Sequence, residues 1–329
     1  MAAETDLNYA AMSAPNALAV ESMGKKTLLW VLAFLLAASA MIYQRATGPT
    51  YPKRGTIEVD GVEWKYALLR SQETSEMARI LMPGPEGKVQ ADLFWRRYPL
   101  DEPYTKYPML WHPDQKWGKG GNSDTKMKKG VGCLTGDLPI QPAAGKLEYY
   151  LMVDVLDDDQ PAFRVPGDEE TCIIRYKDPV PTTVLYPHIA FMIMTILFGM
   201  RAGLAAITGS ASTRRLAWTT LFCLTTGAMI LGPFVQKYAF GHYWTGFPNG
   251  TDLTDNKSLI MWLTWVLACA VVGLKSKPKE TVTRVTVILA AIVMSGVYMI
   301  PHSKQGSELD YSKLEEGVDP KAAIGTGDD

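Results

Sequence analysis

Five apolar stretches, each close to the length of a membrane-spanning helix, dominate the pattern of hydrophobic and polar positions. A helix rises 1.5 Å per residue, so about 20 residues cross the hydrocarbon core of a bilayer. Charged residues, proline or glycine bound each stretch, and the stretches cover residues 27–43, 184–207, 216–235, 259–274 and 285–300. We therefore predict five transmembrane helices. Short links join the last four, which predicts an antiparallel four-helix bundle over residues 182–303.

The first stretch reads as a retained signal anchor. It begins far from the N-terminus and lacks a clean small-residue cleavage site, both of which argue against a removable signal peptide. Residues 1–26 before it and residues 304–329 at the other end are polar and rich in small residues. We expect a flexible segment at each end of the chain.

Between residues 44 and 181 the hydrophobic period changes to two, which is the period of β-strands. In the sequence GKLEYYLMVDV, every second residue from Leu147 to Val155 falls on one face. Similar alternation begins at Val62 and at Val89, and turn sequences such as MPGPEG and QPAAG separate the segments. The pattern predicts an all-β domain, an antiparallel sandwich rather than alternating strands and helices.

The short basic links predict how the chain is oriented in the membrane. If the chain crosses the membrane five times, three clusters of basic residues fall on the same side of the membrane. The clusters are Lys25 with Lys26, Arg214 with Arg215, and Lys275, Lys277 and Lys279 with Arg284. Basic links mark the cytoplasmic side. The β-domain, the loop 237–257 and the C-terminal tail should then lie in the periplasm of a bacterium, outside its inner membrane.

Composition and motifs exclude some classes of function. The chain has 33 basic and 34 acidic residues and a formal net charge of −1, so it offers no basic footprint for nucleic acid. We find no glycine-rich phosphate loop, nucleophile elbow or HExxH motif, so the sequence contains no evidence of an enzyme.

The last four apolar stretches carry no Asp, Glu or Lys in their cores, and Arg201 lies near the cytoplasmic end of its helix, where it can snorkel. Ion-coupled carriers normally need ionisable groups inside the membrane. This pattern disfavours a secondary transporter, and a transporter of a neutral solute is kept as a weaker alternative.

The four cysteines divide between the two parts of the chain. Cys133 and Cys172 lie in the β-domain, where an oxidising compartment would allow a disulfide, and two free thiols are the alternative. Cys223 and Cys269 lie in apolar stretches and read as packing residues.

Three histidines are predicted at the outer ends of the helices. His188 begins the second span, His242 follows the third and His302 follows the fifth. Imidazoles on facing helices suit a b-type haem, for which His188 and His302 are the candidate ligands, or a metal ion. The alternative is that these histidines only tolerate the water boundary.

The loop GHYWTGFPNGTDLTDNK gathers aromatic, amide and carboxylate side chains. Asp252 and Asp255, with His242, could bind a metal ion through this loop. The alternative is an interfacial hairpin whose aromatic residues lie among the lipid headgroups and in which Asp255 caps the fourth helix.

The order LFWRRY, YTKYPMLW and LPIQPAAGKLEYYL, over residues 88–155, resembles the immunoglobulin-like or fibronectin-type-III-like domains of bacterial exported proteins. The insertion HPDQKWGKGGNSDTKMKKG departs from that pattern and leaves its loop geometry undefined. The whole chain resembles bacterial polytopic membrane proteins that carry such a domain in the periplasm. The resemblance implies a fold and brings no activity with it.

Two functions from different classes remain. The first is a non-enzymatic membrane subunit or scaffold whose periplasmic β-sandwich binds a partner protein or a second copy, with the lipid-embedded bundle as its anchor. The second is a haem- or metal-binding redox subunit that uses the three histidines.

Overall fold

The computed structural model describes residues 22–113, 132–156, 161–274, 280–301 and 306–325. The chain divides into two compact units, a helical unit and a β-rich unit, which we describe separately. The helical unit is made of Met1–Ile42, His188–Met229 and Ser258–Ile300. The β-rich unit is made of Tyr43–Pro187, Ile230–Lys257 and Pro301–Asp329. The predicted domain boundary at residue 181 therefore left out two segments that fold with the β-strands.

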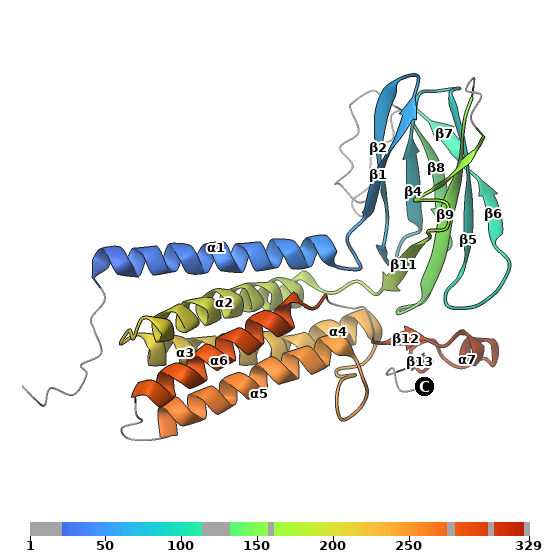
Figure 1. Cartoon of the computed structure of the whole chain (residues 1–329). Helices are drawn as coiled ribbons and strands as arrows, with labels where there is room; N and C mark the ends of the chain where they lie inside the picture. Colours follow the sequence, from blue (N-terminus) through green and yellow to red (C-terminus); the bar gives the residue numbers. More distant parts are fainter. Residues whose placement is uncertain (1–21, 114–131, 157–160, 275–279, 302–305, 326–329) are drawn as a thin grey trace, which may run out of the picture. The chain divides into compact units, whose positions relative to one another are not determined.

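The described residues include five helices that are long and apolar enough to cross a membrane, as predicted (Figure 1). They are α1 (Met23–Thr47), α2 (Thr182–Ile207), the continuous helix Thr213–Phe240, α5 (Leu253–Leu274) and α6 (Glu280–Met299). The continuous helix consists of α3 (Thr213–Leu224), a π-helical turn η1 (Thr225–Leu231) and α4 (Gly232–Phe240).

Small residues let the helices of the helical unit pack closely. A Cβ atom at Gly199 of α2 would lie 2.4 Å from the Met294 Cε atom of α6, and one at Gly203 would lie 2.8 Å from the Ala291 Cβ atom. Such close approach increases van der Waals contact, which drives helix association inside a membrane. Helix α1 joins the same core through Ala37 and Ala40.

Two arginines behave differently at one end of α2. Arg284 of α6 donates from Nε to the Ala206 carbonyl (2.8 Å) and from Nη2 to the Ile207 carbonyl (2.7 Å), so it satisfies carbonyls that the helix end leaves open. Arg201 does not snorkel as predicted. It is 1% exposed, and its guanidinium group lies 5.5 Å from the centre of the Trp30 ring of α1, which offers an aromatic face in the interior.

The basic ends of the helices lie together, as the count of five spans requires. Figure 1 shows the start of α1, the link from α2 to α3, the end of α5 and the start of α6 at the same end of the helical unit. Lys25, Arg214 and Arg284 therefore mark one end of this unit.

The β-rich unit contains a six-stranded and a three-stranded sheet. The larger sheet has the order β3-β11-β9-β5-β6, with β10 paired to β9, and only the pair β3 and β11 is parallel. Its strands are β3 (Ser71–Glu73), β5 (Val89–Arg97), β6 (Thr105–Pro108), β9 (Lys146–Val155), β10 (Phe163–Val165) and β11 (Cys172–Lys177).

The smaller sheet has the order β4-β8-β7 and is made of β4 (Ala78–Pro83), β7 (Leu110–His112) and β8 (Cys133–Leu138). A separate hairpin pairs β1 (Lys53–Val59) with β2 (Val62–Leu68).

Alternate residues of these strands build one hydrophobic core. In β9 the residues predicted to share a face, from Leu147 to Val155 in steps of two, are all buried. They pack with buried residues from β1, β2, β4, β5, β8 and β11. The period-two prediction is confirmed for β5, β9 and β11, whose alternate residues are buried in this core.

The C-terminal segment is folded, which corrects the prediction of a flexible tail. Residues 306–325 contain β12 (Glu308–Leu309), the short helix α7 (Tyr311–Glu315) and β13 (Ile324–Gly325), and β12 pairs with β13. Leu309, Tyr311 and Ile324 form a small core with Ala143 and Ala144 of the loop before β9. The segment is polar in composition, and a few apolar residues are enough to attach it.

We expect Leu151→Ala to lower the free energy of unfolding of the β-rich unit by about 2–5 kcal/mol, because Leu151 is fully buried and its loss leaves a cavity. The free energy of unfolding is measured by denaturant unfolding of the whole protein in mild detergent, with protease cleavage of the β-rich unit as the readout of unfolding. Met152→Ala is the matched control, since Met152 faces outward on the same strand and should change stability by less than about 1 kcal/mol. Equal effects would contradict the assigned faces.

Candidate functional site

The outward face of the six-stranded sheet carries a cluster of aromatic and cationic side chains, which we call the sheet face. Its members are Phe94, Arg96, Tyr104, Lys106, Tyr150 and Arg164. Phe94 of β5 and Tyr150 of β9 are directly opposite each other, and their rings stack with centroids 4.9 Å apart. Tyr104 meets the Tyr150 ring edge-on at 5.0 Å. Cross-strand aromatic pairs of this kind stabilise the sheet.

Three cations lie over these rings. Arg164 is 3.7 Å from the centre of the Tyr150 ring, Arg96 is 4.6 Å from that of Tyr104, and Lys106 is 5.8 Å from that of Phe94. A cation over an aromatic face is attracted by the ring quadrupole. The face is therefore rich in Arg and Tyr, two of the three residue types that dominate binding energy at protein interfaces.

Arg164 differs from the other two cations because no carboxylate neutralises it in the described part of the chain. Arg96 pairs with Glu148 at 2.8 Å, and Lys106 pairs with Asp92 at 2.8 Å. Arg164 forms no ion pair with described residues, and its Nε is buried without a hydrogen-bond partner there. Among the described residues, the sheet face therefore keeps one guanidinium group without a carboxylate partner.

Glu148 is firmly held as a carboxylate at the edge of this face. Burial raises its pKa, but hydrogen bonds donated by Thr171 (2.7 Å) and Arg96 (2.8 Å) outweigh burial, so the pKa lies below its usual value. This ion pair thereby holds Arg96 over the Tyr104 ring.

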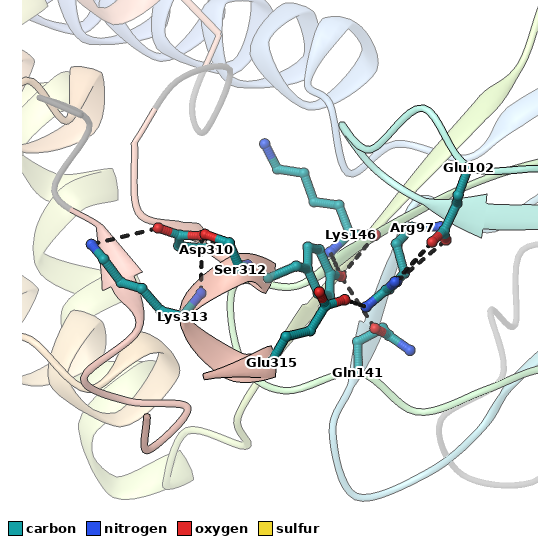
Figure 2. A network of polar contacts seen from close by, with 9 residues as sticks. Arg97, Glu102, Gln141, Lys146, Asp310, Ser312, Lys313 and Glu315 are labelled. Carbon is teal, nitrogen blue, oxygen red and sulfur yellow. Dashed lines mark hydrogen bonds and ion pairs between the residues drawn. The ribbon is translucent and has the colours of Figure 1, made fainter. Parts of the chain in front are cut away.

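A second polar network attaches the C-terminal segment to the β-strands (Figure 2). The Lys146 amide donates to the Tyr311 hydroxyl oxygen at 3.0 Å. The hydroxyl in turn lies 3.0 Å from the Lys146 carbonyl and 3.1 Å from Gln141 Oε1, either of which can accept its proton. Burial raises the pKa of Tyr311 to about 12, so the hydroxyl stays protonated and can donate.

Arg97 joins this network from β5. It donates to Glu102 from Nη2 at 2.8 Å and to Glu315 of α7 from Nη1 at 3.0 Å (Figure 2). The hydrogen bonds from Arg97 lower the pKa of Glu102. Asp310 begins α7 as its cap by accepting the Ser312 amide at 2.9 Å. No local sequence pattern indicates this attachment, because Lys146 and Tyr311 are 165 residues apart.

The loop before α5 is organised by the two carboxylates proposed as metal ligands. Asp252 accepts the amides of Thr254 (2.7 Å) and Asp255 (3.2 Å), so Asp252, rather than Asp255 as predicted, caps α5. Asp255 instead accepts the amides of Thr245 (2.7 Å) and Gly246 (3.1 Å). Both carboxylates are therefore used in shaping the loop.

The histidines lie in different surroundings. His188 Nδ1 is 2.9 Å from the Gly227 carbonyl, and because a carbonyl only accepts, Nδ1 carries the proton. His242 is half-buried, and its Nε2 has no hydrogen-bond partner among the described residues. His302 lies outside the described residues. Within the described part of the chain, no three His, Cys, Asp or Glu side chains lie together in a way that could hold a metal ion.

The disulfide considered for Cys133 and Cys172 is not formed. Both are buried free thiols, Cys133 on β8 of the three-stranded sheet and Cys172 on β11 of the six-stranded sheet. The Cys172 thiol donates to the Leu69 carbonyl at 3.5 Å, and burial raises its pKa to about 11. Cys223 and Cys269 are buried, as expected for packing residues.

A pocket of about 410 Å³ lies between the loop before β9 and the C-terminal segment. Ile140, Pro142 and Ile324 make its wall largely apolar, and Asp178 and Lys321 supply charge. These two charges lie 3.9 Å apart. The pocket thus shares its walls with the attachment of the C-terminal segment.

No protein-family model, curated protein or solved structure matches this chain. The site is therefore defined by its own geometry. The sheet face gathers aromatic and cationic side chains of the types common at protein interfaces. Sequence reasoning located its strands but missed the face itself. One feature of the sequence could have indicated the sheet face. The outward positions of β5 and β9 carry Phe94 and Tyr150, where a solvent-exposed strand face would carry only polar residues.

Tyr311→Phe should loosen the C-terminal segment, because the Lys146 amide, the Lys146 carbonyl and Gln141 lose a common partner. Loss of buried hydrogen bonds of this kind costs about 1–3 kcal/mol. Hydrogen exchange of residues 306–325 should accelerate about tenfold or more. Tyr107→Phe, at an exposed tyrosine, is the control and should leave exchange unchanged. An unchanged rate in Tyr311→Phe would show that the hydroxyl does not hold the segment.

Attachment of the C-terminal segment should also weaken in acid. A carboxylate whose pKa is lowered on folding contributes stability that is complete above its unfolded pKa, near 4.5 for Glu102, and is lost as the pH falls through the lower folded value. Hydrogen exchange of residues 306–325, corrected for intrinsic rates, should therefore rise below about pH 4.5. Glu102→Gln should show the loosened state already at pH 7. A profile that stays flat to pH 3 in the unaltered protein would contradict this role of Glu102.

Proposed function

We propose that this protein is a non-enzymatic subunit or scaffold of a membrane complex, and that the sheet face of its β-rich unit binds a partner protein. The observation that carries the proposal is Arg164, which lies 3.7 Å from the centre of the Tyr150 ring and has no carboxylate partner among the described residues. An aromatic surface that presents one guanidinium group without a carboxylate is suited to an acidic side chain from another protein.

The β-rich unit is proposed to be an immunoglobulin-like module. In that fold one sheet pairs strands B, E and D, and the other pairs G, F, C and, in variable-type domains, C′. Numbering β4 to β9 as B, C, C′, D, E and F, with β11 as G, gives β4-β8-β7 for the first sheet and β11-β9-β5-β6 for the second, to which this protein adds β3 and β10. The sheet face then corresponds to the outer surface of the G-F-C-C′ sheet.

The chemistry of the partner follows from how the rings are used. Arg164 and Phe94 both lie against the Tyr150 ring, and Lys106 lies over Phe94. Flat sugar rings need free aromatic faces, and these rings are already covered. The ring edges and Arg164 remain available, which favours a protein surface with a carboxylate set among apolar side chains.

The location we propose is a bacterial inner membrane, with the helices as a bundle in the lipid and the β-rich unit in the periplasm. The support is the distribution of charge. Lys25, Arg214, Arg215 and Arg284 lie at one end of the helical unit, and basic residues mark the cytoplasmic side.

Arg164→Glu should abolish co-purification of the partner from membranes solubilised in mild detergent, because it replaces attraction for a carboxylate by repulsion. Loss of one partner of a buried charge pair costs about 2–5 kcal/mol, which weakens binding by about thirtyfold or more, and charge reversal should cost at least as much. Lys65→Glu is the matched control, since Lys65 is an exposed cation on the separate hairpin of β1 and β2.

Two results would refute this function. One is an unaltered protein that always elutes alone and monomeric. The other is a companion that Arg164→Glu and Lys65→Glu retain or lose equally, which would place the binding surface elsewhere.

A second candidate function is a haem- or metal-binding redox subunit, and the hydrogen bond of His188 favours it. Metal-ligating histidines usually donate their other ring N–H to a carbonyl or carboxylate. His188 does so to Gly227 of the π-helical turn, which leaves Nε2 with its lone pair. Turns of this type are frequent at functional sites.

For this second function, the purified protein should show a Soret band or one equivalent of bound metal, and His188→Ala should lose it. His242→Ala separates the two proposed ligand sets, because His242 was assigned to a metal rather than to haem. A protein without a Soret band and without stoichiometric metal would exclude this function and leave the first one untouched.

A further inference from the structure

A cavity lies at the basic end of the helical unit and is not used by the proposed function. It has a volume of about 530 Å³ and is lined by Ala211, Ser212, Arg214, Arg215 and Trp218. Its lining residues come from the link between α2 and α3 and from the start of the third membrane-spanning helix. Figure 1 shows where these two elements lie. The end of a span lies at the depth of the lipid headgroups.

The two arginines of this cavity have no described partner. Arg214 and Arg215 are exposed, and neither side chain forms an ion pair or hydrogen bond with the residues that the structure describes. Arg284, at the same end, is already used: it donates to the carbonyls of Ala206 and Ile207 and faces Glu280 at 3.9 Å. Two adjacent guanidinium groups with open donors are suited to the oxygens of a phosphate group.

Trp218 marks the membrane boundary on the same side of the helix. It follows Arg214 by four residues and Arg215 by three, so one helical turn separates it from both. The ring packs against α5, because a Cβ atom at Gly273 would lie 2.8 Å from Trp218 Cζ2. The residue is nevertheless 46% exposed. Tryptophan prefers the headgroup zone, where its apolar ring meets lipid and its N–H meets water.

We propose that this cavity binds the headgroup of an anionic phospholipid. The arginines contact the phosphate oxygens, and Trp218 lies beside the glycerol and the upper acyl chains. A lipid supplies both a phosphate group for the two arginines and an apolar part for Trp218. A free phosphate ion supplies only the phosphate. The two unneutralised cations favour a headgroup of net negative charge over a zwitterionic one.

The test uses the whole purified protein in mild detergent and native mass spectrometry with three probes: phosphatidylglycerol, phosphatidylcholine and inorganic phosphate. The unaltered protein should retain phosphatidylglycerol in preference to the other two. Arg214→Gln with Arg215→Gln should weaken its binding by about tenfold or more, since each surface cation contributes to attraction for anionic lipid. Lys25→Gln with Lys26→Gln is the matched control, because it removes the same charge from the same end of the unit but outside the cavity.

A third variant keeps the test decisive if the arginine variant does not fold. Ala211→Trp retains both arginines and fills the cavity, so it should also lose phosphatidylglycerol. Three results would overturn the proposal. They are equal loss in the arginine and lysine variants, retention of phosphatidylglycerol by Ala211→Trp, and binding of inorganic phosphate or phosphatidylcholine as strongly as phosphatidylglycerol.

Discussion

Every backbone N–H and C=O group that leaves water must find a hydrogen-bond partner, and this requirement divides the chain into its two units. Inside hydrocarbon only a helix satisfies these groups within one segment, so the five apolar stretches are helical. Where a helix leaves a backbone carbonyl without a hydrogen bond, a side chain can donate one. Arg284 donates to the end of α2, and His188 donates to Gly227 in the π-helical turn. In the β-rich unit, strand pairing does the same work and leaves one face of each strand free to enter a common core.

The features that could be predicted from the sequence are those that depend on residues close together in the chain. Alternation from Leu147 to Val155 assigned the faces of β9 because side chains in a strand change sides at every residue. The five spans were equally accessible, since bilayer thickness sets a minimum length for an apolar run. Because successive spans run in opposite directions, five spans also predict that Lys25, Arg214 and Arg284 lie at the same end of the helical unit. In the structure, the helix ends that carry them lie at that end.

The features that escaped prediction depend on partners far apart in the chain. Tyr311 forms hydrogen bonds with Lys146 and Gln141, and no local sequence pattern around residue 311 indicates partners so distant in the chain. Cys133 and Cys172 are both buried, yet their thiols are free, and spacing along the chain does not reveal the distance between two strands. Arg201 is buried, and its guanidinium group lies over the Trp30 ring of another helix. The sheet face exists only once β5 and β9 pair in the register that sets Phe94 opposite Tyr150.

The central claim is that the helices cross a membrane and hold the sheet face on the outer side, where a partner can reach Arg164. Labelling of single introduced cysteines in intact spheroplasts with a membrane-impermeant maleimide tests it directly. All four native cysteines are buried, which keeps the background low. Lys65→Cys, on β2, should be labelled in intact spheroplasts, and Ala211→Cys, between α2 and α3, only after the membrane is opened. Protection of Lys65→Cys together with labelling of Ala211→Cys would reverse the orientation and contradict the account.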